Sequence, residues 1–199
     1  MGNLPYAVSG IVLCGGLSRR MGQDKALLPW NGQTLLGRAV QALQTITEEV
    51  IVVARAGQAL PAHPGRMVTD RIAGAGPLGG LEAGLAAMGT PYGVVVACDM
   101  PWLNSALLKE MTKLAPGFDL VIPYVAGKHQ PLHAVYAKSL RSVVTGLLAQ
   151  GERRIWALMS RVRARVLDES FLRTCDPALR SVMSLDDRIS FLEAVAERS

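Results

Sequence analysis

Apolar residues follow two spacings along this chain. Some form short continuous runs that end at once in glycine, proline or a polar residue, which is typical of buried strands. Others recur every three or four positions, as in a helix with one buried face. The continuous runs predict strands over 9–13, 50–54, 67–69, 93–98, 120–123, 132–136 and 163–167. The helical spacing predicts helices over 34–46, 78–88, 102–114, 140–148, 153–159 and 185–196.

The order of these elements predicts the fold class. Strands that are apolar throughout and separated by helices favour a mostly parallel sheet that is covered on both faces. We therefore expect an α/β protein, a three-layer sandwich around a Rossmann-like sheet. The chain has 199 residues, no internal repeat and no long linker, so we expect a single domain over residues 1–199.

Charge and aromatic content narrow the class of partner. The formal net charge is +5, but the basic residues are not strongly clustered and aromatic residues make up only 5% of the chain. Proteins that bind single-stranded nucleic acids combine a positive groove with aromatic stacking platforms. The sequence therefore argues against a nucleic-acid partner, and a small anionic substrate accounts for the charge equally well.

The same chain gives no sign of a membrane or secretory setting. Its longest apolar stretch falls well short of the ~18 residues that a spanning helix needs, and no basic segment precedes an apolar one at the N-terminus. Cys14, Cys98 and Cys175 are odd in number and lack CxxC spacing, which argues against a disulfide framework and a zinc ribbon. We expect a cytoplasmic protein with no membrane partner.

Ligands of open α/β sheets bind beyond the carboxyl ends of the strands. The first such segment, residues 13–25, is rich in glycine and basic residues. Gly15 and Gly16 let backbone N–H groups approach an anion, and Arg20 and Lys25 supply positive charge. No Gly-Lys-Ser/Thr follows, which excludes a P-loop. The structural alternative is an ordinary glycine-rich turn with solvated arginines.

A second segment, residues 74–79, reads G-x-G-x-x-G and is followed 20 residues beyond Gly79 by Asp99. This is the pattern of a Rossmann dinucleotide site, so an NAD(P)-dependent oxidoreductase is an alternative function. The loop before Gly74 is longer than a Rossmann turn, however. Pro77 also removes an N–H where a pyrophosphate needs donors.

A third segment places acidic chemistry at the same edge of the sheet. Asp99 follows an apolar strand and precedes Pro101, a position from which its carboxylate could hold a divalent cation. The alternative is that Asp99 caps the helix that begins near Trp102. Asp70 ends its own short strand, and its alternative is a turn-forming aspartate.

Three smaller features have weaker signals. His129 and His133 are four residues apart but separated by Pro131, so a surface or substrate-rim role is expected rather than a metal pair. Cys98 has no histidine placed to activate it and is expected to be a small buried residue. The pair Arg153 and Arg154 is equally compatible with a helix surface and with a substrate contact.

The chain resembles a known family in these same segments. Residues 11–25, IVLCGGLSRRMGQDK, resemble the opening signature of the nucleotidyltransferases that move a nucleoside monophosphate onto a phosphate. The likeness is greatest to the MobA-like molybdenum cofactor guanylyltransferases, whose loop reads LAGGxSxRMGxDK. Further similar blocks follow in family order: GPLGG at 76–80, CDMP at 98–101, QPLHAVY at 130–136, GERR at 151–154 and the segment 181–187.

The resemblance implies a reaction in which GMP passes from GTP to molybdenum-bound molybdopterin, giving the guanine dinucleotide cofactor and pyrophosphate. It implies Mg²⁺ as cofactor, GTP and the molybdopterin cofactor as partners, and cofactor-delivery and acceptor molybdoenzyme proteins as further partners. The implied catalytic residues are Lys25, Asp99 and Arg20, with Asp99 as the metal ligand. The implied nucleotide-binding residues are Leu13, Cys14, Gly15, Gly16, Lys25, Asp70 and Asp99.

The sequence departs from the family pattern at three places. Cys14 stands where the family usually has Ala, and Val53 or Ala54 stands where some members place a nucleotide-contacting Asn. Residues 181–184, Ser-Val-Met-Ser, replace Asn-Val-Asn-Thr, which predicts weaker polar contacts from that segment. A cytidylyltransferase, a sugar-phosphate nucleotidyltransferase and an inactive nucleotide-binding regulator therefore remain as further alternatives.

Overall fold

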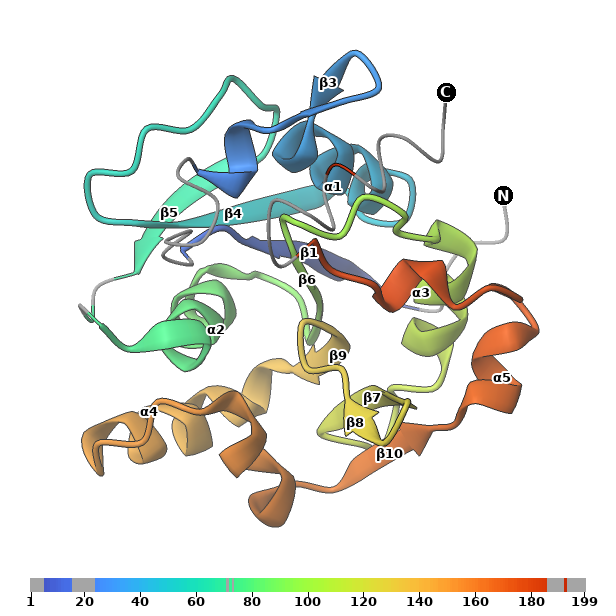
Figure 1. Ribbon diagram of the computed structural model, residues 1–199. Helices are drawn as coiled ribbons and strands as arrows, with labels where there is room; N and C mark the ends of the chain where they lie inside the picture. The colour runs from blue at the N-terminus through green and yellow to red at the C-terminus, as the bar shows by residue number, and fades with distance from the viewer. Residues whose placement is uncertain (1–5, 16–23, 71, 73, 186–191, 193–199) are drawn as a thin grey trace.

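The computed structural model describes residues 6–15, 24–70, 72, 74–185 and 192, and its centre is a twisted eight-stranded sheet (Figure 1). The strands lie in the order β10-β7-β9-β6-β1-β4-β5, and the short β8 pairs with β7. The strands of this sheet are β1 (Val8–Leu13), β4 (Glu49–Arg55), β5 (Arg66–Asp70), β6 (Tyr92–Ala97), β7 (Leu120–Val125), β8 (Lys128–His129), β9 (His133–Ala137) and β10 (Ala164–Leu167).

The sheet is mostly parallel, as the sequence predicts. β1 runs parallel to β4 and β6, β4 runs parallel to β5, and β10 runs parallel to β7. β9 is the exception in the main path, because it pairs antiparallel with both β6 and β7. From β1 the chain first builds outward through β4 and β5 and then crosses to the other side with β6. The switch point, where ligands of such sheets bind, thus lies between β1 and β6.

Helices cover both faces and enclose two apolar cores. α1 (Leu35–Gln44), α3 (Ser105–Lys113) and α5 (Glu169–Arg173) pack on one face around residues such as Val12, Val96 and Leu107. α2 (Gly76–Ala87), α4 (Arg141–Ala149) and the 3₁₀ helix Ile155–Arg161 pack on the other face around Ile11, Val95 and Leu81. The alternation of Ile11 and Val12 between the two cores follows from the period of two in a strand.

α2 lies unusually close to the sheet because it is rich in glycine. A Cβ atom at Gly84 would come within 2.7 Å of the Ile11 Cγ2 atom, and one at Gly80 would be 3.5 Å from the Leu13 side chain. A side chain at Gly84 would push the helix away from β1, whereas a Cβ at Gly80 would be in ordinary van der Waals contact. Since the first turn of α2 reaches the carboxyl end of β1, this close packing also positions the helix N-terminus at the switch point.

Most predicted elements are confirmed, within a few residues at their ends. Thr34 caps α1 as predicted, its Oγ1 accepting a hydrogen bond from the Gly37 N–H at 3.1 Å. The predicted helix over 153–159 is instead a 3₁₀ helix, and α5 was not predicted. Of the predicted closing helix over 185–196, Leu185 is not helical, and all the other residues except Leu192 lie outside the described residues.

A small hairpin before α1 also escaped prediction. β2 (Pro29–Trp30) and β3 (Gln33–Thr34) are joined by Asn31 and Gly32, which have φ values of 50° and 76°. Two successive positive φ values are the requirement of a type I′ turn, and Asn-Gly is the pair that best meets it.

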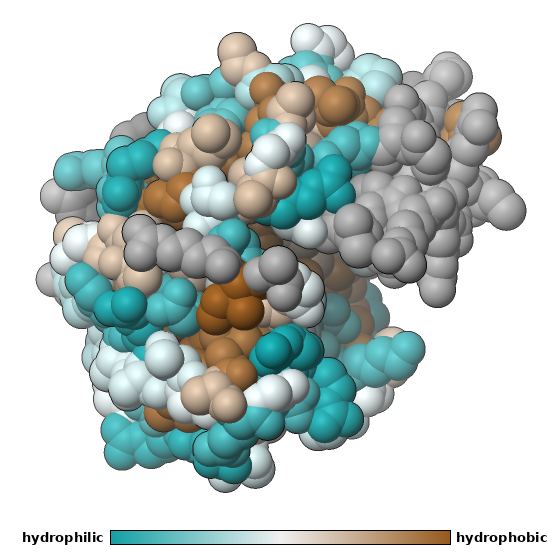
Figure 2. All heavy atoms as spheres, turned by 90° about the vertical axis from the view of Figure 1, so that its left-hand side faces the viewer, coloured by the Kyte–Doolittle hydropathy of each residue, from teal (hydrophilic) through white to brown (hydrophobic). Residues whose placement is uncertain are grey.

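On the face that Figure 2 shows, hydrophilic side chains surround a recessed part that is lined by apolar side chains. No helix in the part of the chain that the structure describes is long and apolar enough to cross a membrane.

Candidate active site

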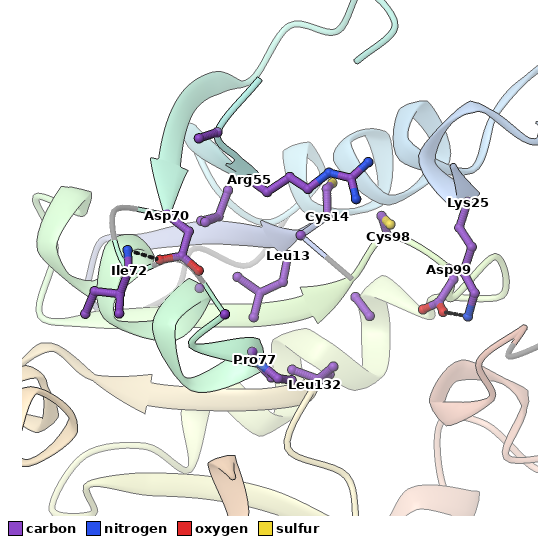
Figure 3. A pocket seen from close by; sticks show the side chains of 17 residues that line it. Leu13, Cys14, Lys25, Arg55, Asp70, Ile72, Pro77, Cys98, Asp99 and Leu132 are labelled. Carbon is purple, nitrogen blue, oxygen red and sulfur yellow. Dashed lines mark hydrogen bonds and ion pairs between the residues drawn. The ribbon is translucent and has the colours of Figure 1, made fainter. Parts of the chain in front are cut away.

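A cleft of about 630 Å³ opens where the carboxyl ends of β6, β1, β4 and β5 meet (Figure 3). In this view Asp70 lies at one end and Lys25 with Asp99 at the other, with Leu13, Pro77 and Leu132 between them. The three segments that the sequence singles out thus meet at one edge of the sheet. The cleft is lined by Leu13, Cys14, Gly15, Lys25, Val53, Arg55, Ala56, Asp70, Ile72, Gly74, Gly76, Pro77, Gly80, Ala97, Cys98, Asp99 and Leu132.

Lys25 and Asp99 form an ion pair at the polar end of the cleft. The Lys25 Nζ and Asp99 Oδ2 atoms are 2.6 Å apart, and the two side chains are only 16% and 13% exposed. Asp99 does not cap the following helix, since Asn104 Oδ1 accepts the hydrogen bonds of the Ala106 and Leu107 N–H groups. The capping alternative for Asp99 is therefore wrong, and its carboxylate faces the cleft.

The donor set at this end of the cleft fits a magnesium ion that is shared with a substrate. In the described part of the chain, no three His, Cys, Asp or Glu side chains gather closely enough to hold a metal ion by themselves. Mg²⁺ is commonly bound by one or two carboxylates together with substrate phosphates. The Asp99 carboxylate, beside the positive charge of Lys25, matches that arrangement.

The backbone at the start of the glycine-rich segment is already used within the protein. The Cys14 N–H donates to the Val53 carbonyl at 2.9 Å, and the Leu13 carbonyl accepts from the Cys98 N–H at 3.2 Å. The Cys14 N–H is therefore not available to a cradle of backbone donors. Of the predicted site residues, Gly16 and Arg20 lie outside the described residues.

A polar network that the sequence did not reveal links Cys14 and Asp24, which lie near the two ends of the glycine-rich segment 13–25. Gln58 Nε2 donates to the Cys14 carbonyl at 3.1 Å and to Asp24 Oδ2 at 2.6 Å, while its Oε1 accepts from the Arg55 N–H at 3.0 Å. The Arg55 guanidinium is also 3.5 Å from Asp24 Oδ2 and lines the cleft. In the sequence, only the position of Arg55 directly after the predicted strand 50–54 indicated that this residue could belong to the site.

Asp70 stabilises a turn, which was the alternative to a binding role, and it also lines the cleft. Its Oδ1 accepts a hydrogen bond from the Ile72 N–H at 2.9 Å. Its carboxylate also lies against α2, because a Cβ at Gly79 would be 2.9 Å from Asp70 Oδ2. A contact between Asp70 and a nucleotide stays a prediction.

Cys98 is buried, as predicted, and lies beside Cys14 at the wall of the cleft. A hydrogen bond with the Cys14 thiol, together with burial, raises the pKa of Cys98 well above its usual range. A thiol that resists ionisation is a poor nucleophile. This agrees with the expectation that Cys98 is not catalytic.

The expectation of a surface or rim role is wrong for His133. Its side chain is fully buried, and its Nε2 is 2.7 Å from Ser181 Oγ. Ser181 Oγ also accepts from the Asn104 N–H at 2.9 Å, and the Ser181 N–H donates to Asp176 Oδ2 at 2.7 Å. Ser181 thus makes hydrogen bonds within the protein, while the weaker polar contacts expected of the segment 181–184 as a whole stay a prediction.

The GERR segment lies in a loop near the start of α2 rather than on a helix. Glu152 Oε1 accepts hydrogen bonds from the N–H groups of Arg153 and Arg154 and from Arg154 Nε, each at 2.8 Å. These bonds, above all those from Arg154, lower the pKa of Glu152 to about 2. The Arg153 carbonyl lies 3.5 Å from where a Gly76 Cβ would be, so the segment adjoins the cleft wall.

These features define a class of protein. A switch-point cleft with an apolar middle, a buried lysine–carboxylate pair and a glycine-rich basic segment is suited to a phosphorylated nucleotide and its metal ion. Residues 10–166 match the MobA-like NTP transferase domain, and the chain belongs to that family. It is therefore a nucleotidyltransferase, which confirms the resemblance seen in the motifs and rules out the oxidoreductase alternative.

Individual relatives agree with this assignment. A probable molybdenum cofactor guanylyltransferase of Chloroflexus aggregans is 38% identical over 185 residues, which cover 90% of this chain and 89% of the relative. The crystal structure of molybdopterin-guanine dinucleotide biosynthesis protein A from Archaeoglobus fulgidus covers 96% of this chain and 100% of its own, with a TM-score of 0.81 and 23% identity. A Mycobacterium tuberculosis protein in complex with manganese has the same fold at 18% identity, with a TM-score of 0.61 and coverage of 87% and 100%.

Proposed function

We propose that this chain is a molybdenum cofactor guanylyltransferase. It transfers GMP from GTP to molybdenum-bound molybdopterin, forming the guanine dinucleotide cofactor and releasing pyrophosphate. The observation that carries the proposal is the 38% identity, over 90% of the chain, to the probable molybdenum cofactor guanylyltransferase of Chloroflexus aggregans. The ion pair in the cleft, Lys25 with Asp99, supplies the charges that the reaction needs.

The reaction needs no protein nucleophile. The terminal phosphate oxygen of the pterin attacks the α-phosphorus of GTP in line, a new P–O bond forms, and the bond to the β-phosphate breaks. Because a phosphate oxygen is already a nucleophile, the protein contributes positioning and charge neutralisation. Lys25 and Arg20 neutralise the negative charge that builds up on the phosphates.

The two ends of the cleft differ in chemistry, which supports one orientation of the nucleotide. In this orientation the phosphates meet Lys25 and Asp99, and the nucleoside extends toward Asp70 over the apolar middle of the cleft, which includes Leu13, Val53 and Pro77. The Gly15 backbone, which lines the same cleft, is available to the base. This placement puts a buried ion pair next to the phosphates and apolar side chains next to the flat base.

Asp99 is the residue that would hold Mg²⁺, together with phosphate oxygens of GTP. When bound, the ion neutralises charge on those oxygens and helps to align them. Lys25 then gives up its ion pair with the Asp99 carboxylate and pairs with a phosphate of GTP instead. The ion pair thus keeps both groups compensated until the substrate arrives.

The partners follow from the reaction. They are GTP, the molybdopterin cofactor and, beyond these, proteins that deliver the cofactor and molybdoenzymes that accept it. A cytoplasmic setting suits GTP as substrate and the three free cysteines.

A cytidylyltransferase is the second candidate. Val53 and Ala54 are buried at the position where some relatives have a nucleotide-contacting Asn, so the base is selected by other groups. Thermal denaturation with GTP, CTP, ATP and NAD, each with Mg²⁺, tests both candidates. A ligand at 100 times its Kd adds ~2.7 kcal/mol to the free energy of unfolding, and we expect GTP to raise the melting temperature most. A larger shift with CTP would favour the second candidate, and a shift with NAD alone would contradict both.

A further inference from the structure

Asp99 lies in the connection from β6 to α3, residues 98–104, and two hydrogen bonds hold this connection from a distant part of the chain. The Asp99 carbonyl accepts from the Leu185 N–H at 3.0 Å. The Asn104 N–H, at the other end of the connection, donates to Ser181 Oγ at 2.9 Å. Both bonds come from residues that follow α5. The backbone that carries Asp99 is therefore held from outside the motifs that line the cleft.

Ser181 is itself anchored to the sheet. Its Oγ is 2.7 Å from His133 Nε2, and His133 begins β9, which pairs with β6. The Ser181 N–H donates to Asp176 Oδ2 at 2.7 Å. Because Ser181 is 0% exposed, its hydroxyl does not reach the surface of the cleft. Ser181 therefore links a strand of the sheet to the connection that carries Asp99, and it acts on the cleft through that connection.

The 176–185 segment, which runs from α5 past the start of α3 (red in Figure 1), also packs against neighbours of the ion pair. Leu185 is 2% exposed and shares a small apolar core with Leu28, against which Trp102 packs. Leu28 and Trp102 each lie three residues beyond a member of the ion pair in the cleft. The Arg180 guanidinium lies 4.5 Å from the centroid of the Trp102 ring. The segment thus contacts the backbone regions that carry both charged groups.

We propose that the 176–185 segment holds Asp99 in the position that metal binding requires, with Ser181 as the positioning residue. This inference rests on the proposed function, in which Asp99 would hold Mg²⁺. Mg²⁺ demands near-ideal octahedral geometry, so a displaced ligand binds it less tightly. Groups that orient metal ligands from outside typically contribute about 10–100-fold to metal affinity or activity.

The contacts of Ser181 define the variants for a test. Ser181→Ala removes the acceptor of the Asn104 N–H and the partner of His133 Nε2, and thus releases the α3 end of the connection. Ser181→Thr is the conservative variant, because it keeps the hydroxyl. Thr112→Ala is the matched control, since Thr112 is also 0% exposed and its hydroxyl donates to a backbone carbonyl of α3 at 2.8 Å. The control removes a buried hydroxyl but none of the proposed contacts.

Amide hydrogen exchange of the full-length protein, without nucleotide or metal, tests the contacts themselves. In wild type, the N–H groups of Asn104 and Leu185 should be protected. In Ser181→Ala both should exchange about tenfold faster, because the hydrogen bond that fixes the connection is lost. Ser181→Thr and Thr112→Ala should resemble wild type at these two positions. Unprotected amides in wild type would overturn the proposal even if a variant fails to fold.

Pyrophosphate release, measured against Mg²⁺ concentration at saturating GTP, tests the effect on the metal site. The Mg²⁺ concentration that gives half the maximal rate should rise about tenfold in Ser181→Ala and return toward the wild-type value in Ser181→Thr. The KM for the pterin acceptor should not change. A purely structural role would lower the melting temperature and leave the Mg²⁺ requirement as it is, which is the result expected for Thr112→Ala.

An unchanged Mg²⁺ requirement in Ser181→Ala would overturn the proposal, and so would an equal rise in Thr112→Ala. A higher KM for the pterin as the main effect would also overturn it, because the segment would then serve the acceptor. If wild type shows no turnover with GTP, the proposed function fails, and the exchange rates still decide whether the segment holds the Asp99 backbone.

Discussion

Lys25 and Asp99 carry most of the chemistry expected of the cleft. Each side chain is less than one-fifth exposed, and each compensates the charge of the other at 2.6 Å. A substrate that brings phosphates and a cation supplies a new partner to each residue, phosphates to Lys25 and the cation to Asp99. Replacing Lys25 should therefore weaken phosphate binding, and replacing Asp99 should abolish the dependence of turnover on the metal ion.

Replacing Lys25 by Ala should lower the rate of pyrophosphate release by about 10–100-fold, because it removes a charge-assisted contact worth ~1.5–3 kcal/mol. The fold should persist, since a lysine at this position adds little packing. Lys113→Ala is the matched control, because Lys113 forms an equally short but exposed pair with Glu110 at 2.6 Å on α3. Equal activity in the Lys25 and Lys113 variants would remove Lys25 from the site.

Asp99→Asn keeps the shape of the side chain but removes the charge that a hard cation needs. We expect Mg²⁺-dependent turnover to be lost while the melting temperature without ligand changes little. Glu110→Gln is the control for loss of a carboxylate from an ion pair. A steep fall in melting temperature together with persisting turnover would show that Asp99 serves stability rather than metal binding.

The site residues that could be predicted from the sequence are charged residues that directly follow a predicted strand or a glycine-rich segment. Lys25, Asp70 and Asp99 follow predicted strands or glycines, and the structure brings them to one cleft. Gln58 and Arg55 were missed, because their importance comes from contacts with Cys14 and Asp24, which are more than 30 residues away in the sequence. No local pattern distinguishes such a glutamine from a solvent-exposed one.

The close packing of α2 on β1 depends on small residues. Gly84→Ala should destabilise the protein by ~1–3 kcal/mol, since the new methyl group would meet Ile11 Cγ2 at 2.7 Å. Gly146→Ala in α4 has no atom within 4 Å of the new Cβ and should be neutral or stabilise by ~0.4–1 kcal/mol. Urea denaturation of both variants measures the difference, and equal stabilities would contradict the packing argument.

His133, at the start of β9, should make the free energy of unfolding of the protein depend on pH. Burial lowers its pKa from 6.5 to about 4, an effect that the nearby Asp176 partly opposes. Between these two values the unfolded chain binds the proton and the folded protein does not. The free energy of unfolding should therefore fall as the pH drops from 6.5 to 4, by at most ~1.4 kcal/mol per pH unit from this residue.

The variant His133→Gln should have a flatter profile of unfolding free energy against pH, whatever its absolute stability. His129→Gln is the control, because this histidine lies on the short β8 and is only half-buried. Parallel profiles for wild type and His133→Gln would show that another group sets the pH dependence.

The elements themselves were largely predictable, since long apolar runs and helical spacing leave few alternatives. The exceptions are short elements, such as α5 and the β2–β3 hairpin, which have only two to five residues in each segment. The direction of β9 was also beyond the sequence pattern. An apolar strand of five residues reads the same whether it pairs parallel or, as here, antiparallel with β6 and β7.

Across the whole molecule, the order of the strands explains why distant segments share one site. β6, β1, β4 and β5 are adjacent and parallel, so residues 13, 55, 70 and 97 end at the same edge. Alternation of strands and helices predicts such an edge, and the motifs identify which strand ends matter. The order of the strands does not predict which groups select the base. The backbone N–H and carbonyl of Cys14 are not among them, because both are hydrogen-bonded within the protein.

The proposed reaction is the transfer of GMP from GTP to the pterin. Its decisive measurement is pyrophosphate release with GTP, CTP, ATP and UTP, at matched Mg²⁺ and with molybdenum-bound molybdopterin as acceptor. A buried polar group left unpaired by the wrong base costs ~1–3 kcal/mol, so GTP should be preferred over CTP and ATP by at least about tenfold. A clear preference for CTP, or release that does not depend on the pterin acceptor, would contradict it.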